Sequence, residues 1–210
     1  QVLAAVAVPL RPEPLQLAGM GEAAGPGVPE DVTAPAPAAT PEDLKKAGND
    51  LYVKDDFVGA IEQYGLAIQA METAKGETPE LPEDRKALAV LYSNRAQAAL
   101  SLVKKGQSGK KMQLGGLPRE LRPHAMRAGA DASQAAELDE ANAKAWLRKG
   151  QALLWLSAMQ QRAKESVSCL ERALRGALPD SLRPEAEMWL KYARAAFDKE
   201  TPMPEQCPQM

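Results

Sequence analysis

The chain has 210 residues, of which 45% are hydrophobic and 4% aromatic, and its formal net charge is −2. This length and hydrophobic content suffice for one domain with a real core, and the near-neutral charge argues against electrostatic binding of nucleic acid or membranes by the whole molecule. No run of sequence reaches the ~18 apolar residues of a membrane span. Two cysteines, Cys169 and Cys207, are too few for a disulfide framework, which favours a reducing compartment.

The first part of the chain, residues 1–39, is rich in Ala, Pro and Gly and has no sustained periodicity. Such a segment cannot bury enough apolar surface to offset its ordering entropy, so we expect a disordered arm or linker. Its apolar start lacks a basic region and an initiator Met, which favours a truncated or excised chain over a signal peptide. That interpretation leaves room for an upstream domain.

Ordered structure is predicted to begin at Thr40, which can cap a helix whose first residue is Pro41. Apolar and small residues then recur at helical spacing, which predicts a series of amphipathic helices. We expect these helices at residues 41–53, 57–74, 82–102, 124–138, 143–159, 161–175 and 181–199. Residues 104–123, with four Gly, two Pro and six basic residues, are expected to form a basic insertion, and residues 200–210 a flexible tail.

Three of the predicted helices carry polar side chains in an equivalent pattern. Lys144 and Arg148 stand four residues apart, so a helix places both on the same face. Lys45 and Asn49 repeat this spacing on the first helix, and Asn94 lies within the comparable third helix. If these helices are equivalent elements of a repeat, we expect their polar side chains to line one groove.

The helix pairs resemble tetratricopeptide repeats, which are helical hairpins of about 34 residues with small and aromatic residues at fixed positions. The resemblance lies in Leu44, Ala47, Gly48, Leu51, Ala60, Tyr64 and Ala67, in Trp146, Gly150, Leu153, Ala163, Val167 and Leu170, and more loosely in Tyr92, Ala96, Ala99, Ala128, Ala132 and Ala135. It implies an all-α fold, a right-handed α-solenoid over residues 40–199. Three helix-turn-helix repeats, at about residues 41–75, 83–140 and 143–177, would be closed by a C-terminal capping helix at residues 181–199.

The chain also resembles the carboxylate-clamp co-chaperones, a subset of tetratricopeptide proteins. Those proteins carry Lys-x-x-x-Asn on the first helix, Asn-Arg on the third and Lys-x-x-x-Arg on the fifth. The pattern is matched here by Lys45, Asn49, Asn94, Lys144 and Arg148. The resemblance implies a cytoplasmic co-chaperone or chaperone adaptor that binds peptide carboxylates. Its partners would be the Glu-Glu-Val-Asp tails of cytosolic heat-shock chaperones of the seventy- and ninety-kilodalton classes, not nucleic acid or membranes.

Two other functions stay open: the C-terminal targeting domain of a larger enzyme, such as a prolyl isomerase or protein phosphatase, and a scaffold that uses the convex face or the basic insertion. Within this chain we expect no enzyme, cofactor or metal site. His124 is the only histidine, which excludes a multi-histidine metal site. The basic insertion has no interleaved aromatic residues for base stacking, so we expect a solvated loop there. Cys169 and Trp146 are expected to be packing residues.

Overall fold

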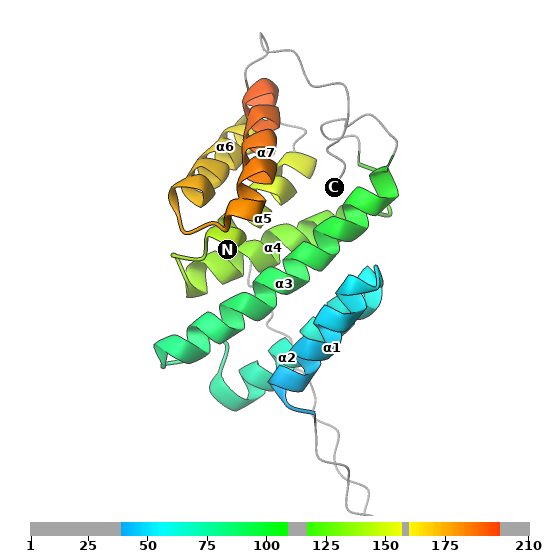
Figure 1. The fold of residues 1–210 in the computed structure, drawn as a ribbon, viewed down its shortest axis with the longest axis vertical. Coiled ribbons are helices and arrows are strands. Elements are labelled where there is room, and N and C mark those ends of the chain that lie inside the picture. Colours follow the sequence, from blue (N-terminus) through cyan, green and yellow to red (C-terminus); the bar gives the residue numbers. More distant parts are fainter. Residues whose placement is uncertain (1–38, 109–116, 157–159, 198–210) are drawn as a thin grey trace, which may run out of the picture. The chain divides into compact units, whose positions relative to one another are not determined.

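The computed structural model describes residues 39–108, 117–156 and 160–197, except for the side chains of residues 160, 161 and 197. In these ranges the chain forms α-helices and one short 3-10 helix, and no strand (Figure 1). The α-helices are α1 (Pro41–Val53), α2 (Phe57–Lys75), α3 (Pro82–Gln107), α4 (Arg122–Leu138), α5 (Ala143–Trp155), α6 (Gln160–Arg175) and α7 (Arg183–Phe197). The predicted tail, most of the predicted arm and the middle of the basic insertion lie outside the described residues.

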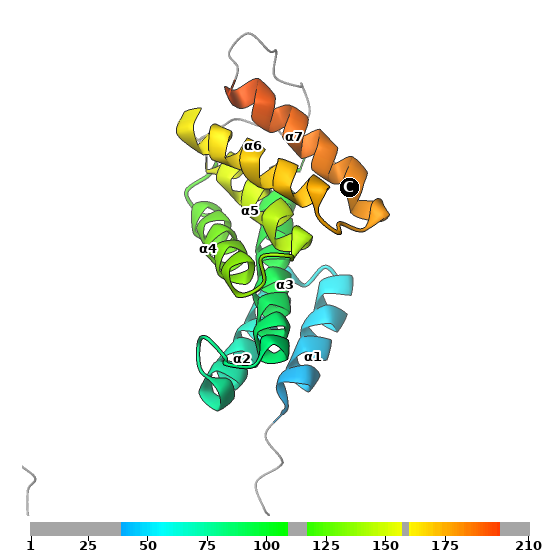
Figure 2. The same cartoon turned by 90° about the vertical axis from the view of Figure 1, so that its left-hand side faces the viewer.

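The helices stack as pairs within one compact unit that begins at Ala38. Helix α1 packs on α2, α3 on α4 and α5 on α6, and α7 covers α6 at the end of the stack (Figure 2). Neighbouring pairs are joined by contacts of α2 with α3 and of α4 with α5. The predicted all-α architecture of three helical hairpins and a capping helix is therefore confirmed. None of the described helices is long and apolar enough to span a bilayer.

Short polar motifs cap the starts of α1, α2 and α5, and the predicted cap at Thr40 is confirmed. The side chain of Thr40 accepts a hydrogen bond from the backbone N–H of Asp43 at 3.2 Å, and the Asp43 carboxylate in turn accepts from Thr40, which completes a capping box before Pro41. Asp56 caps α2 through the N–H of Gly59 at 3.0 Å, and Asn142 caps α5 through that of Ala145 at 3.1 Å.

Small residues allow the helices of each pair to approach closely. A Cβ atom at Gly48 would come within 2.7 Å of the Tyr64 ring, and one at Gly150 within 2.6 Å of Leu170. Residues larger than glycine are therefore excluded from these two helix contacts unless the facing side chain moves. Toward the end of the stack the core becomes aromatic, and Trp155 meets the Trp189 ring edge-on, with the ring centroids 5.8 Å apart.

One predicted boundary is wrong in an informative way. The sequence predicts that the third helix ends at Leu102 and that Lys104 lies in a solvated loop. In the structure α3 continues to Gln107. Lys104 forms a 2.5 Å ion pair with Glu185 of α7, and only 10% and 15% of these two side chains are exposed. Tertiary contacts thus extend the helix through a segment whose glycine content disfavours it.

Candidate functional site

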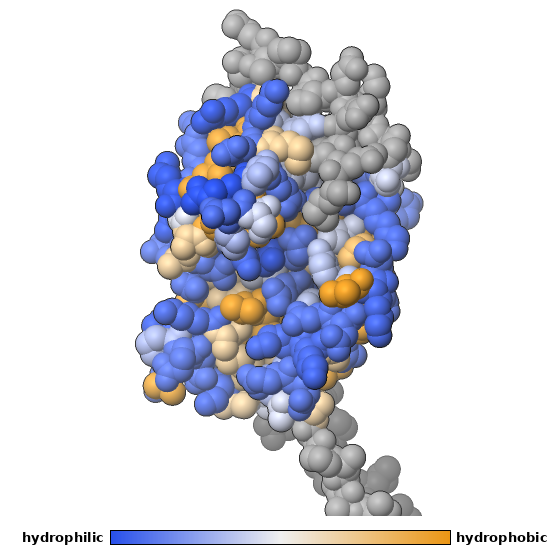
Figure 3. Space-filling model, viewed as in Figure 1, coloured by the Kyte–Doolittle hydropathy of each residue, from blue (hydrophilic) through white to orange (hydrophobic). Residues whose placement is uncertain are grey.

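The five residues of the predicted clamp lie on α1, α3 and α5, the first helices of the three pairs. Helix α1 carries Lys45, which is half-buried, and Asn49, which is exposed. Asn94 on α3 is half-buried, and α5 carries the exposed Lys144 and the buried Arg148. Helices α1, α3 and α7 face the viewer in Figure 1, and the same face is mainly hydrophilic in Figure 3. We call the surface formed by α1, α3 and α5 the groove.

Arg148 is the most unusual of the five, because it is a cation that is only 8% exposed. Its Nε donates to Oε1 of Gln97 at 3.1 Å, and its Nη1 donates to Oγ of Ser93, so two neutral side chains of α3 hold the guanidinium. No carboxylate of the described residues lies within ion-pair distance of it. Burial lowers the pKa of Arg148 to about 10, as expected for a charge that is removed from water without an adjacent anion.

A hydrogen-bond network connects this arginine to the first helix. The Nε2 of Gln97 donates to the hydroxyl of Tyr52 and to Oγ of Ser101, both at 3.3 Å, and these two hydroxyl groups lie 2.9 Å apart. Gln97 therefore bridges Arg148 on α5 and Tyr52 on α1. Hydrogen bonds thus connect side chains of α1, α3 and α5.

A second contact orients Asn49. The buried Tyr64 donates its hydroxyl hydrogen to Oδ1 of Asn49 at 2.7 Å, and burial raises the pKa of Tyr64 to about 12. Because the amide oxygen of Asn49 is engaged, its NH₂ group is the end left to meet a ligand, and this group only donates. This orientation suits an acceptor such as a carboxylate.

The charges at the α7 end of the same helices are paired internally. Glu185 accepts from Nζ of Lys104 at 2.5 Å and from Nε2 of Gln151 at 3.0 Å. Burial by itself would raise the pKa of Glu185, but the charge of Lys104 and these hydrogen bonds keep it below its usual value. Lys104 therefore neutralises Glu185, whereas no carboxylate of the described residues lies within ion-pair distance of Arg148, although the charge of Glu185 partly offsets the lowering of the Arg148 pKa by burial.

Sequence reasoning predicted the five clamp residues but missed the residues that contact Asn49 and Arg148. Ser93 lies directly before Asn94 in the sequence. Gln97 lies four residues, or about one helical turn, after Ser93, so this spacing could have indicated that Gln97 shares the helix face of Ser93. The structure joins Asn49 to Tyr64 and Arg148 to α3. For Lys45, Asn94 and Lys144 it gives the helix and the exposure alone.

Two residues that the sequence assigns to packing have that role. Trp146 is partly buried against the core, and its Nε1 donates to the backbone oxygen of Glu140 at 2.9 Å. Arg172 stacks over its ring at 4.1 Å from the centroid. Cys169 is buried, and burial raises the pKa of its thiol to about 11, which makes the thiolate scarce at neutral pH.

Comparison with known proteins identifies the architecture. No family model matches the chain. Protein unc-45 homolog B of Xenopus laevis is 30% identical over 129 residues, which are 61% of this chain and 11% of that protein, so the chain spans about a tenth of its length. The Arabidopsis OM64 TPR domain is 25% identical, with 74% of this chain and 94% of that domain covered and a TM-score of 0.49.

A further solved structure supports the fold. The first TPR of Spaghetti (RPAP3), bound to the HSP90 peptide SRMEEVD, is 22% identical, with 75% of this chain and 94% of that chain covered and a TM-score of 0.50. The described part of the chain has the tetratricopeptide-repeat fold, and the predicted fold is therefore confirmed.

Proposed function

We propose that this tetratricopeptide-repeat domain is a chaperone adaptor that binds the C-terminal carboxylates of Glu-Glu-Val-Asp tails in its groove. The observation that carries the proposal is Arg148, a buried guanidinium that is held by neutral side chains and has no carboxylate partner among the described residues. A buried charge of this kind costs free energy, which an incoming anion would recover. The tails of the seventy- and ninety-kilodalton cytosolic chaperones supply such an anion, so the domain would act in the cytoplasm.

Each of the five groove residues would supply a particular kind of hydrogen-bond donor to such a tail. The last residue of the peptide presents two carboxylates, its terminus and the Asp side chain, and this target requires several donors on a preformed surface. Lys45 and Lys144 would supply mobile point charges and Arg148 a planar fork of donors. Asn49 and Asn94 would add directional donors without further charge. The RPAP3 domain, which shares this fold, binds a peptide with this ending.

The expected affinity is moderate. Charge-assisted hydrogen bonds contribute about 1.5–3 kcal/mol each, whereas association costs about 4–15 kcal/mol. Five such bonds of about 3 kcal/mol each, about 15 kcal/mol in all, against an association cost of about 7 kcal/mol leave about −8 kcal/mol, which corresponds to a dissociation constant of about 1 μM.

Calorimetric titration with the acetylated peptide Met-Glu-Glu-Val-Asp tests the proposal. We expect saturable binding by the wild-type chain, and a loss of about tenfold or more when the peptide's C-terminus is amidated, because one carboxylate is then removed. Lys45 and its neighbour Lys46 offer a matched pair, since Lys45 is half-buried and forms the predicted Lys-x-x-x-Asn pattern with Asn49, whereas Lys46 is exposed and lies outside that pattern. Lys45→Ala should weaken binding by about tenfold and Lys46→Ala by less than about twofold. Equal affinity for the free and amidated peptides would refute a carboxylate clamp.

A further inference from the structure

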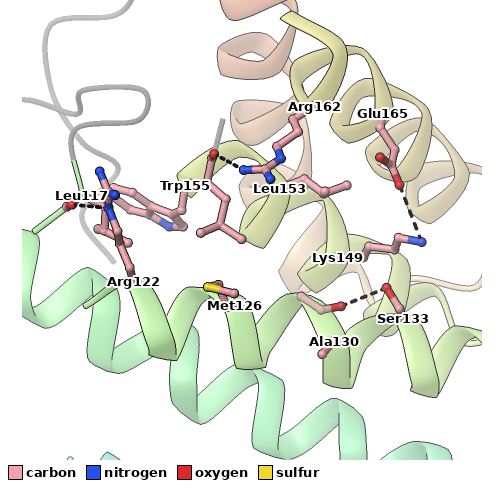
Figure 4. Close-up of a pocket in the computed structure, with 12 residues that line it drawn as sticks. Leu117, Arg122, Met126, Ala130, Ser133, Lys149, Leu153, Trp155, Arg162 and Glu165 are labelled. Atoms are coloured by element: carbon pink, nitrogen blue, oxygen red, sulfur yellow. Dashed lines mark hydrogen bonds and ion pairs between the residues drawn. The ribbon is translucent and has the colours of Figure 1, made fainter. Parts of the chain in front are cut away.

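A second concave surface lies among the helices α4, α5 and α6. It is a hollow of about 500 Å³, and its apolar lining is formed by Leu117, Met126, Leu153, Trp155 and Leu156. Figure 4 shows Met126 on α4 facing Leu153 and Trp155 across the hollow. None of the five predicted clamp residues lines this hollow, and none of the five lies on α4 or α6. Its size falls in the range of about 300–1,000 Å³ that is typical of ligand sites.

Met126 is the feature of this hollow that most needs an explanation. Met126 is 62% exposed, and it lines the same hollow as the apolar Leu153 and Trp155. Methionine is flexible and polarisable, and it is used on surfaces that adapt to a partner's side chains. An apolar side chain from outside would remove Met126 from water.

The rim of the hollow is basic. Among the lining residues Arg122, Lys149 and Arg162 are cations and Glu165 is the single anion. Backbone carbonyls orient the two arginines: Nη1 of Arg162 donates to the oxygen of Leu156 at 2.7 Å, and Nε of Arg122 donates to that of Leu117 at 3.1 Å. Lys149 and Glu165 lie 3.8 Å apart, at the limit of an ion pair. Arg162 and Lys149 thus place two cations beside one anion, Glu165, on the rim, and hydrogen bonds to backbone carbonyls orient the two arginines.

The hollow continues along α4. A neighbouring depression of about 600 Å³ shares Met126 and Ala130 with it and adds Arg127 and His124 to the lining. Asp131, which also borders this depression, is bound to Arg95 and does not neutralise the added charge. The two depressions make a continuous surface with Met126 between them, which suits an extended or helical protein segment better than an enclosed small molecule.

We infer that this surface is a second docking site, which binds a protein segment with an apolar anchor between acidic residues. The apolar anchor would contact Met126 and Leu153, and the flanking carboxylates would meet Arg162 on one side and Arg127 on the other. The rim cations are spread along the surface rather than gathered at one point. Recognition at this site therefore needs no C-terminal carboxylate and is independent of the groove.

A peptide with both termini blocked separates this site from the clamp. The probe is acetylated, amidated Glu-Asp-Glu-Leu-Leu-Glu-Asp-Glu, titrated into the full ¹⁵N-labelled chain and followed by NMR. We expect saturable shifts at residues 122–133 and 149–156 and at the Trp155 indole N–H, with the groove residues of α1 unchanged. A peptide with Ser in place of both Leu, and one with Lys in place of the acidic residues, should each bind at least about tenfold more weakly.

A matched pair of charge reversals on α6 completes the test. Arg162 lines the hollow, whereas Arg175, at the other end of the same helix, is exposed and does not. Arg162→Glu should weaken the probe at least about tenfold and Arg175→Glu less than about twofold, and both should still bind the Met-Glu-Glu-Val-Asp peptide like the wild type. Equal losses in the two variants, shifts confined to the groove, or no saturable binding of the probe would each overturn the inference.

Discussion

Two arginines in this molecule, the half-buried Arg95 and the buried Arg148, have opposite surroundings. Arg95, on the side of α3 that packs against α4, donates through Nε and Nη2 to both carboxylate oxygens of Asp131 at 2.8 Å. Burial by itself would lower the pKa of Arg95, but Asp131 raises it above the ordinary value. Arg148 in the groove is held by neutral side chains only, and burial lowers its pKa to about 10.

This difference in surroundings distinguishes Arg95, which stabilises the fold, from Arg148, which we propose binds a ligand. Arg95 and Asp131 neutralise each other's charge and join α3 to α4. Arg95 therefore has no uncompensated charge with which to bind a ligand. Arg148 is also held by hydrogen bonds, but no carboxylate of the described residues forms an ion pair with it and Glu185 attracts it only from a greater distance, so under the proposed function an external carboxylate would pair with it. Burial and hydrogen bonding alone do not distinguish the two roles. The presence of an internal counter-ion does.

The largest effect is expected when the closed pair is broken. Arg95→Ala leaves Asp131 buried without its partner, which should lower the free energy of unfolding by about 3–5 kcal/mol. Urea denaturation followed by circular dichroism measures the change. The double variant Arg95→Met with Asp131→Leu is the control, and it should recover much of the loss because no unpaired charge remains. A change below about 1 kcal/mol in the single variant would contradict the structural role of the pair.

The open arginine should respond in the opposite way. Arg148→Met removes a buried, uncompensated charge, so the free energy of unfolding should change by no more than about 1 kcal/mol. Affinity for the acetylated Met-Glu-Glu-Val-Asp peptide should fall by about 100-fold, or about 2.7 kcal/mol. Calorimetry and urea denaturation of the same variant give both numbers. A stability loss as large as that of Arg95→Ala, with affinity retained, would make Arg148 a structural residue instead.

Supplying an internal counter-ion should convert the open site into a closed one. Gln97→Glu places a carboxylate where the amide oxygen now accepts from Nε of Arg148 at 3.1 Å. We expect about tenfold weaker peptide binding together with a higher melting temperature, because the new carboxylate competes with the peptide for the guanidinium. Gln69→Glu adds the same charge at an exposed position on α2 and should leave both properties unchanged. Weaker binding with lower stability would point to general disruption of the groove.

The smallest effect is expected at the exposed cation of the clamp. Lys144 lies one turn before Arg148 but is in contact with solvent, where salt screens its charge over about 10 Å at 0.1 M ionic strength. Lys144→Ala should weaken peptide binding by about threefold to fivefold and make the affinity less sensitive to added salt. Titrations at several salt concentrations measure this slope. A slope identical to that of the wild type would exclude Lys144 from the site.

Much of the fold and the positions of the proposed clamp could be predicted from the sequence. Thr40, Asp56 and Asn142 mark helix starts because a side-chain oxygen that caps a helix binds an N–H two or three residues further along the chain. The spacing of Lys144 and Arg148 gives a shared face for the same reason, since both features depend on neighbours within one helical turn.

Only the tertiary structure decided what each charged side chain meets. The partners of Arg148 lie 51 and 55 residues away in the chain, and Glu185 lies 81 residues from Lys104. From the sequence alone, Lys104 is therefore assigned to a basic loop. The sequence also does not distinguish Arg95, which has an internal carboxylate partner, from Arg148, which has none within ion-pair distance among the described residues. Helical periodicity specifies the face on which a side chain stands, whereas an ion pair depends on which helix packs against that face. The packing of distant helices thus made one arginine a closed pair and left the other open.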